Sequence, residues 1–466
     1  MKLGILNFHS VTSIHSDISN SLYFLLVPDN VTLYCPFLEQ NALLLSLTVS
    51  LSSADIKSDH EVTSLPGLEW QPYFKHYAGR LNISETKSLS YWLIESQNDK
   101  DKDPLLLWMN GGPGCSSFFG LLQEHGPFLL SEEKDDLKLH KNPNAWNNFA
   151  NVVYLETPAG SGFSLNTNYS VSQLNDNVTA EDNLNFLHQF LEAYPEYKGR
   201  DFYITGESYG GCLVPTFANH VLLAKEKIEL NFKGIAMGNA VTDNQWSNYK
   251  EVSLALHGAS LTLPVLGQWM REFCPSGFDN LCKGGQVSKK TVKLGEIYAN
   301  MMSNVNKDHF INAYDINRPC NGIDNLGKYL NQPEVQKALH LAVDGTAVKW
   351  QECNDGIYHH YNVCKDITDD VKNIQENNLK ILYFYGETDT VCPFIIGDLF
   401  THKIGKNPKT APWFFDDLYA GTRTTFDGNL TYTTIADCGH MAAAWKPKQT
   451  ARAVHHFIND ISDWNN

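Results

Sequence analysis

The sequence predicts an α/β fold: a mostly parallel sheet with helices on both faces and a helical insertion. From Glu61 onward, short apolar runs alternate with amphipathic helical runs, the pattern of strand-helix-strand units. This rhythm stops between Thr242 and about Tyr329. The chain has 466 residues, 42% hydrophobic and 19% charged, so it can bury a large core.

The strands are predicted from short apolar runs rich in β-branched and aromatic residues. These runs are residues 88–96, 104–109, 151–156, 201–205, 232–239, 379–386 and 429–436. Amphipathic runs at 179–195 and 214–227 predict helices between them. Because parallel strands end at the same edge of a sheet, we expect the loops that follow them to carry the chemistry.

Residues 42–54 resemble a signal peptide. The run is apolar, too short to span a bilayer, and ends in the small-x-small pattern of Ser52 and Ala54. About forty residues precede it, which is unusual for a signal sequence, so we expect an over-extended or mis-joined start. Whether residues 1–41 are translated stays open. The alternative is a buried apolar strand, but we expect 1–54 to lie outside the mature fold.

We expect the core to comprise residues 55–243 and 329–466. Residues 244–328 between them hold Cys274, Cys282 and Cys320, and a helix-like run but no strand pattern. They are therefore expected to form a helical, disulfide-tied cap over the sheet.

Ten cysteines and several N-x-S/T sequons point to an oxidising, secretory compartment. The glycosylation sites expected in the core are Asn82, Asn168, Asn177 and Asn429. The net charge of -16 leaves no basic stripe for nucleic acid or an anionic membrane surface. The sequence contains no CxxC or HExxH motif, so we expect neither a metal site nor a cofactor.

The motif GESYG at 206–210 fits the G-x-S-x-G turn that holds a nucleophilic serine between a strand and a helix. A serine needs a base, and the base needs a group that orients it. In this arrangement the order along the chain is serine, acid, histidine, which suggests Ser208, then Glu387 or Asp389, then His440. The pattern does not separate the two acids.

Two other histidines compete with His440 as the base. His455 and His456 belong to a predicted terminal helix, so we expect them to be structural or solvent-facing.

The glycine-rich stretch at 108–117 is the candidate for an oxyanion hole. It follows a strand, and its backbone can approach closely enough to donate hydrogen bonds to the developing negative charge. We assign the donors to Gly112 and Tyr209; a plain glycine-rich turn is the alternative.

Five segments together resemble the serine carboxypeptidases, from about Leu65 to the C-terminus and most weakly in the cap. They are LLLWMNGGPGCSSFFGLLQEHGPF, NPNAWNNFANVVYLETPAGSGFS, YPEYKGRDFYITGESYGGCLVP, YLNQPEVQKALH and GHM. The resemblance implies an α/β-hydrolase fold with Ser208, Asp389 and His440 as the triad. It favours Asp389 over Glu387 because the family's acid is the second acidic residue of G-D-x-D, here GETD.

The resemblance also implies a site for the free carboxylate at the end of the peptide. The matching residues are Asn110, Gly111, Glu124 and Glu207, with Trp108 in support. This explains a carboxyl directly before a nucleophile, since a pair of carboxyls that holds a proton can donate hydrogen bonds to an anion. The family's G-A-G-H-M-V-P reads DCGHMAA here, a change that affects the leaving-group pocket near Met441.

By the same resemblance, Cys115 and Cys353 match a family disulfide, and Cys274 with Cys282 looks like a cap bridge. The partner of Cys320 and the states of three further cysteines stay open. These three are Cys212, Cys392 and Cys438.

We therefore expect an enzyme that removes C-terminal residues of peptides through an acyl-enzyme, favoured at acid pH, in a lysosome or outside the cell. The alternatives are an acyltransferase on the same scaffold and a protective partner of a glycosidase complex. We expect no membrane span. The preferred terminal residue, cleavage of the cap and the oligomeric state, with a homodimer as one alternative, are undetermined by the sequence.

Overall fold

A computed structural model describes residues 53–168, 174–243 and 324–465, isolated positions between 312 and 318, and the backbone of three short strands near the N-terminus. The chain divides into two units, Met1–Ser58 and Asp59–Asn466. In the first, β1 (Tyr23–Val27) pairs antiparallel with β2 (Asn30–Tyr34), which pairs with β3 (Ser46–Leu47). Helix α1 spans Ser53–Asp59. Most of the predicted cap, including Cys274, Cys282 and Cys320, lies outside the described residues.

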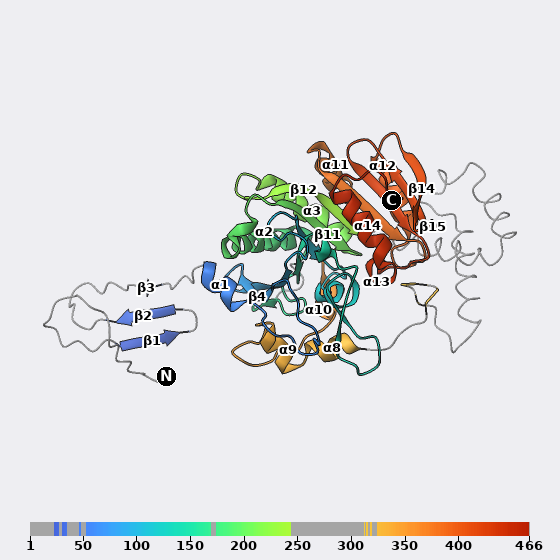
Figure 1. Cartoon of the computed structure of the whole chain (residues 1–466). Coiled ribbons are helices and arrows are strands. Elements are labelled where there is room, and N and C mark those ends of the chain that lie inside the picture. Colours follow the sequence, from blue (N-terminus) through green and yellow to red (C-terminus); the bar gives the residue numbers. More distant parts are fainter. Residues whose placement is uncertain are drawn as a thin grey trace. The chain divides into compact units, whose positions relative to one another are not determined.

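An 11-stranded sheet runs through the described part of the second unit (Figure 1). Its middle strands are parallel, in the order β9 (Asn151–Leu155), β6 (Leu105–Met109), β11 (Asp201–Glu207), β12 (Asn231–Gly238), β13 (Lys380–Gly386) and β16 (Leu430–Ile435). The strands beside them are antiparallel: β5 (Lys87–Ile94), β4 (His76–Asn82), β10 (Leu165–Asn166), β15 (Leu418–Thr425) and β14 (Lys409–Phe415). A separate pair joins β7 (Phe128–Leu130) and β8 (Leu139–Lys141). The predicted mostly parallel sheet is confirmed.

Most residues of the inner strands are buried because both faces of the sheet are covered. Every residue of β6 and β9 is buried, whereas most of the edge strand β14 is exposed. A strand covered on both faces reads as a continuous apolar run. The inner strands were therefore visible in the sequence.

Helices cover the sheet on both faces. On one face, Tyr91 of β5 contacts Phe186 of α2 (Asp176–Ala193), which packs against α3 (Gly210–Leu223). On the other, Tyr203 of β11 contacts Phe457 of α14 (Pro447–Ile458). The shorter helices are α8 (Asn325–Leu330), α9 (Pro333–Ala338), α10 (Asp355–His360), α11 (Thr368–Glu376), α12 (Phe394–Ile404) and α13 (Ala442–Trp445).

Both predicted helices begin earlier than their apolar periodicity indicates. Helix α2 starts at Asp176 because the Asn175 side chain accepts a hydrogen bond from the Val178 N–H and caps the first turn. Helix α3 starts at Gly210, directly after the GESYG turn.

All four predicted glycosylation sites are exposed. Asn82 ends β4, Asn177 lies in the first turn of α2, Asn168 lies just after β10, and Asn429 directly precedes β16. Exposure leaves each side chain accessible to a glycosyltransferase, and the modification itself stays a prediction.

Candidate active site

Ser208 occupies a strained turn at the carboxyl end of β11. Its φ is 62°, in the left-handed region that non-glycine residues seldom adopt. Its N–H donates to the Gly238 carbonyl at 3.0 Å, and its own carbonyl accepts from the Gly211 and Val241 N–H groups. The glycine at 206 is needed for space, since a Cβ there would stand 2.7 Å from the Met109 carbonyl oxygen. The side chain of Ser208 is partly exposed.

His440 and Asp389 follow the ends of β16 and β13. The His440 Nδ1 and an Asp389 carboxylate oxygen are 2.7 Å apart, and both side chains are buried. Because Nδ1–H donates to the carboxylate, the lone pair of the imidazole is on Nε2, the atom that a general base uses. The His440 N–H is held by the Tyr314 carbonyl at 2.7 Å.

The geometry separates the two acids that sequence patterns leave together. Asp389 also accepts from the Asn239 amide at 2.9 Å and from the backbone N–H groups of Val391 and Cys392. The Glu387 carboxyl accepts instead from the Thr434 hydroxyl at 2.7 Å, on the side of β16. Of the two, Asp389 is therefore the acid that holds His440.

Sequence reasoning did not identify Asn239. This residue directly follows β12, between the strands that precede Ser208 and Asp389, so its place at a strand end was the available signal. Its side-chain oxygen accepts from the Gly386 N–H at 3.0 Å while its amide donates to Asp389. Asn239 thus joins the carboxylate to the ends of two neighbouring strands.

The glycine-rich loop after β6 lies directly against the serine turn. A Cβ on Gly111 would be 2.4 Å from the backbone nitrogen of Tyr209 and 2.8 Å from the Cβ of Ser208. The loop is held by the disulfide from Cys115 to Cys353, which confirms that pairing. This approach brings Gly111, the residue before Gly112, beside the residue that follows Ser208.

Glu124 and Glu207 form a buried carboxyl pair beside these groups. Asn110 donates to Glu124 at 3.4 Å and in turn accepts from the Trp108 indole N–H at 2.7 Å. Burial raises the pKa of Glu124 to about 7. The pKa of Glu207 is raised well above its usual range, first by burial and then by the negative charge of Glu124.

The carboxyl pair is electrostatically coupled to the imidazole and its acid. A charge on His440 lowers the pKa of Glu124, and the charge of Asp389 raises that of Glu207. Such effects act over short distances, so the pair and the His440–Asp389 pair belong to one site.

Several other predicted residues lie as follows. Met441 is partly buried at the turn into α13, beside His440 in the chain. His455 contacts Phe149 and His456 contacts Trp464, so of the structural or solvent-facing roles expected for them, both side chains make packing contacts.

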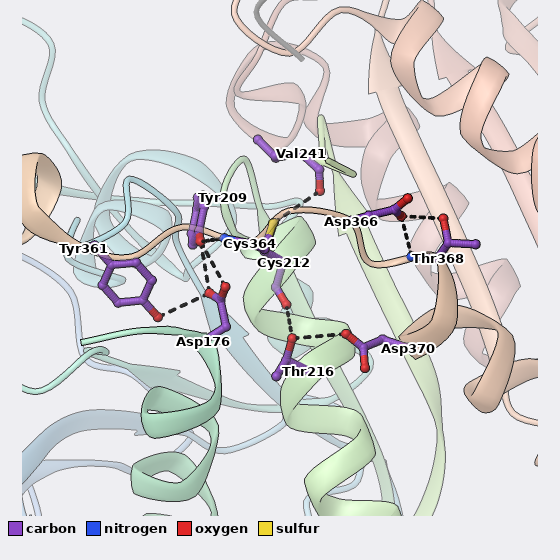
Figure 2. Close-up of a disulfide and its surroundings, with 10 residues drawn as sticks. All are labelled: Asp176, Tyr209, Cys212, Thr216, Val241, Tyr361, Cys364, Asp366, Thr368 and Asp370. Atoms are coloured by element: carbon purple, nitrogen blue, oxygen red, sulfur yellow. Dashed lines mark hydrogen bonds between the residues drawn. A yellow bond between two sulfur atoms is a disulfide. The ribbon is translucent and has the colours of Figure 1, made fainter. Parts of the chain in front are cut away.

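Sequence reasoning left Cys212 open, and the structure pairs it with Cys364 (Figure 2). Cys392 and Cys438 are buried, and neither is disulfide-bonded to another cysteine of the described residues. Burial raises the pKa of the Cys438 thiol. Within the described residues, no group of three or more His, Cys, Asp or Glu side chains could hold a metal ion. No helix of that part of the chain is long and apolar enough to cross a bilayer.

A family model described as serine carboxypeptidase matches residues 66–460. The chain belongs to the serine carboxypeptidase family. It is 34% identical to serine carboxypeptidase ctsa-4.1 of Caenorhabditis elegans over 445 residues, covering 86% of this chain and 93% of the relative. It is 30% identical to the lysosomal protective protein of Mus musculus over 473 residues, covering 90% and 98%.

The fold is also found in a solved structure. Kex1(delta)p, a prohormone-processing carboxypeptidase from Saccharomyces cerevisiae, superposes with a TM-score of 0.67 at 22% identity, covering 87% of this chain and 96% of that one. The family makes this chain a hydrolase whose substrates are peptides cleaved at their C-terminal end. A lysosomal relative and two disulfides are consistent with the secretory pathway.

Proposed function

We propose that this serine carboxypeptidase uses Ser208 as nucleophile, His440 as general base and Asp389 as the group that orients it. The observation that carries the proposal is the 2.7 Å contact between His440 Nδ1 and Asp389, beside a buried pair of glutamates. The strand ends after β11, β13 and β16 bring these residues to one edge of the sheet.

In the first half of the reaction, the Ser208 hydroxyl attacks the carbonyl of the last peptide bond and its proton passes to His440 Nε2. The backbone N–H groups of Gly112 and Tyr209 donate to the oxygen that becomes negative. His440 then gives its proton to the leaving amine, and the C-terminal amino acid departs. Water, deprotonated by His440, hydrolyses the acyl-enzyme and returns Ser208.

The glutamate pair selects substrates with a free terminal carboxylate. Below about pH 7 the Glu124 carboxyl holds a proton because burial raises its pKa to about 7, and burial also raises the pKa of Glu207, so the protonated pair can donate hydrogen bonds. Asn110 and the Gly111 backbone complete this anion site, with Trp108 holding the Asn110 side chain. Above that pH the pair gains negative charge and repels the substrate carboxylate.

Two opposing demands then place the optimum of kcat/KM on the acid side of neutrality. Carboxylate binding weakens as the pH rises through the pKa of Glu124, about 7. His440 must be neutral to accept the serine proton, which lowers kcat in strong acid. Such a profile suits a lysosome-like or acidic extracellular compartment.

The KM of an N-blocked dipeptide with a free C-terminus is expected to rise by up to about tenfold per pH unit above roughly pH 7, since one proton is lost from the glutamate pair. The C-terminally amidated dipeptide should react poorly in acid and show little of this rise. Initial rates across pH 4 to 9, with detection of the released amino acid or amide, measure both substrates.

The double variant Glu124→Gln, Glu207→Gln should flatten the rise in KM because amides do not titrate. Glu156→Gln is a matched control: Glu156 is also fully buried, with a pKa raised to about 7 by burial, but its carboxyl is held by Ser116, the Phe163 N–H and the Trp350 indole. An equal rise for acid and amide substrates that persists in the double variant would refute the carboxylate site.

A further inference from the structure

A second set of links holds the turn after Ser208, formed by side chains that take no part in the reaction above. Cys212, in the first turn of α3, is disulfide-bonded to Cys364, in the segment between α10 and α11 (Figure 2). Cys212 is fully buried, and the disulfide joins positions 152 residues apart in the sequence.

The Tyr209 hydroxyl forms a second connection to the same segment. It accepts from the Cys364 N–H at 2.8 Å and donates to the two carboxylate oxygens of Asp176 at 3.0 and 3.1 Å. Tyr361 also donates to Asp176, at 3.2 Å. Figure 2 shows the Tyr209 and Tyr361 hydroxyls meeting at the Asp176 carboxylate, with the Cys364 backbone at the Tyr209 hydroxyl. One residue of the turn is thus bonded, through its side chain, to both α2 and the 361–364 segment.

Tyr209 is anchored at its side-chain hydroxyl and packed at its backbone nitrogen, and together these contacts fix the orientation of its backbone. Its side chain is buried and anchored at the hydroxyl, while its backbone nitrogen lies beside Gly111 in the glycine-rich loop. Three residues further on, Cys212 is covalently tied to the segment that contacts the Tyr209 hydroxyl. The direction of the Tyr209 N–H therefore depends on the position of the 361–364 segment.

We propose that the Cys212–Cys364 disulfide and the Asp176 carboxylate are positioning groups for the reaction, which aim the Tyr209 N–H at the oxyanion. The inference rests on the role proposed above for that N–H. Stabilisation by an oxyanion donor depends on its being oriented before charge develops, and loss of one donor costs about 10²- to 10³-fold in kcat. A donor that is present but slightly misdirected costs less than a missing one, and the loss falls on the same step, formation of the oxyanion.

A purely structural role makes a different prediction. A disulfide that closes a loop of this length stabilises the fold in any case, so a lower melting temperature does not distinguish the two roles. A donor that acts only as charge develops affects kcat and leaves ground-state binding nearly unchanged. The division of the effect between kcat and KM is therefore the decisive measurement.

The test compares the double variant Cys212→Ala, Cys364→Ala with each single variant and with Tyr209→Phe, at a temperature well below their melting temperatures. We expect kcat for a free-acid N-blocked dipeptide to fall about tenfold in all of them, with KM within about twofold of wild type. The two single variants should match the double variant, because each removes the same bond. The rate at which a phosphonate labels Ser208 should fall in parallel.

Asp370→Asn is the matched control. Asp370 accepts from Asn219 at 2.8 Å and from Thr216 at 3.5 Å, so it ties the same helix α3 to α11, but beyond the first turn (Figure 2). This variant should lose stability and keep its kcat.

An unchanged kcat in the folded double variant, or an equal fall in Asp370→Asn, overturns the positioning role and leaves the proposed function intact. If the double variant does not fold, an unchanged kcat in Tyr209→Phe likewise overturns the positioning role. Full activity of Ser208→Ala, measured alongside, would instead overturn the proposed function and this inference with it.

Discussion

Replacing Ser208 by Ala is expected to lower kcat by on the order of 10⁶, since loss of the nucleophile of a triad removes nearly all of its contribution. A residual acceleration of about 10³- to 10⁴-fold over the uncatalysed reaction should remain from binding and the oxyanion donors. Release of the terminal amino acid from an N-blocked dipeptide measures the loss. Mass spectrometry should locate a serine-directed phosphonate on Ser208 in the wild type and find no label in the variant.

The backbone at Ser208 offers a control for folding. Its φ of 62° suits glycine better than alanine, so Ser208→Gly should be at least as stable as Ser208→Ala and equally inactive. Ser462→Ala, in the exposed segment after α14 and outside every N-x-S/T sequon, should leave kcat and labelling unchanged. A label on any serine other than Ser208 would contradict the assignment.

Replacing Asp389 by Asn is expected to lower kcat by about 10⁴, because an amide facing His440 favours the wrong imidazole tautomer. The buried carboxylate accepts from His440, from the Asn239 amide and from two backbone N–H groups. An asparagine cannot accept from all of these donors, since one side of its amide is itself a donor. The pH dependence of kcat for a dipeptide substrate would show the loss at every pH.

Glu387→Gln is the matched control, two residues away in the same turn. The Glu387 carboxyl accepts a hydrogen bond from the Thr434 hydroxyl, and the amide oxygen of a glutamine can accept the same hydrogen bond. We expect kcat within about fivefold of wild type, because a neutral hydrogen bond at this position contributes about 1 kcal/mol. A large loss in Glu387→Gln together with a small one in Asp389→Asn would reverse the assignment of the acid.

The features of the fold that the sequence predicts correctly are those encoded locally. The inner strands are buried on both faces and so appear as continuous apolar runs, as in residues 104–109 and 151–156. Ser208 directly follows β11 and His440 lies a few residues after β16, and strand ends meet at one edge of a parallel sheet. A search along the chain therefore finds these residues before any tertiary contact is known. The antiparallel strands β14 and β15 were not predicted, since exposed residues along β14 and partly exposed polar residues in β15 interrupt any apolar run.

Other features were decided only by the tertiary structure. From the residues alone, Glu387 and Asp389 are equivalent members of one turn, and the resemblance ranked them by motif. Only the packing of β12 and β16 around β13 brings Asn239 and His440 to Asp389 and Thr434 to Glu387.

The pairing of Cys212 was likewise beyond the sequence, although ten cysteines predicted disulfides. Its partner Cys364 is 152 residues away, and the bond forms because the segment after α10 packs against the first turn of α3. Local residue patterns record which side chains will be buried. Which buried groups face each other depends on how distant elements pack. At this site that packing determines which acidic residue contacts His440 and which cysteine pairs with Cys212.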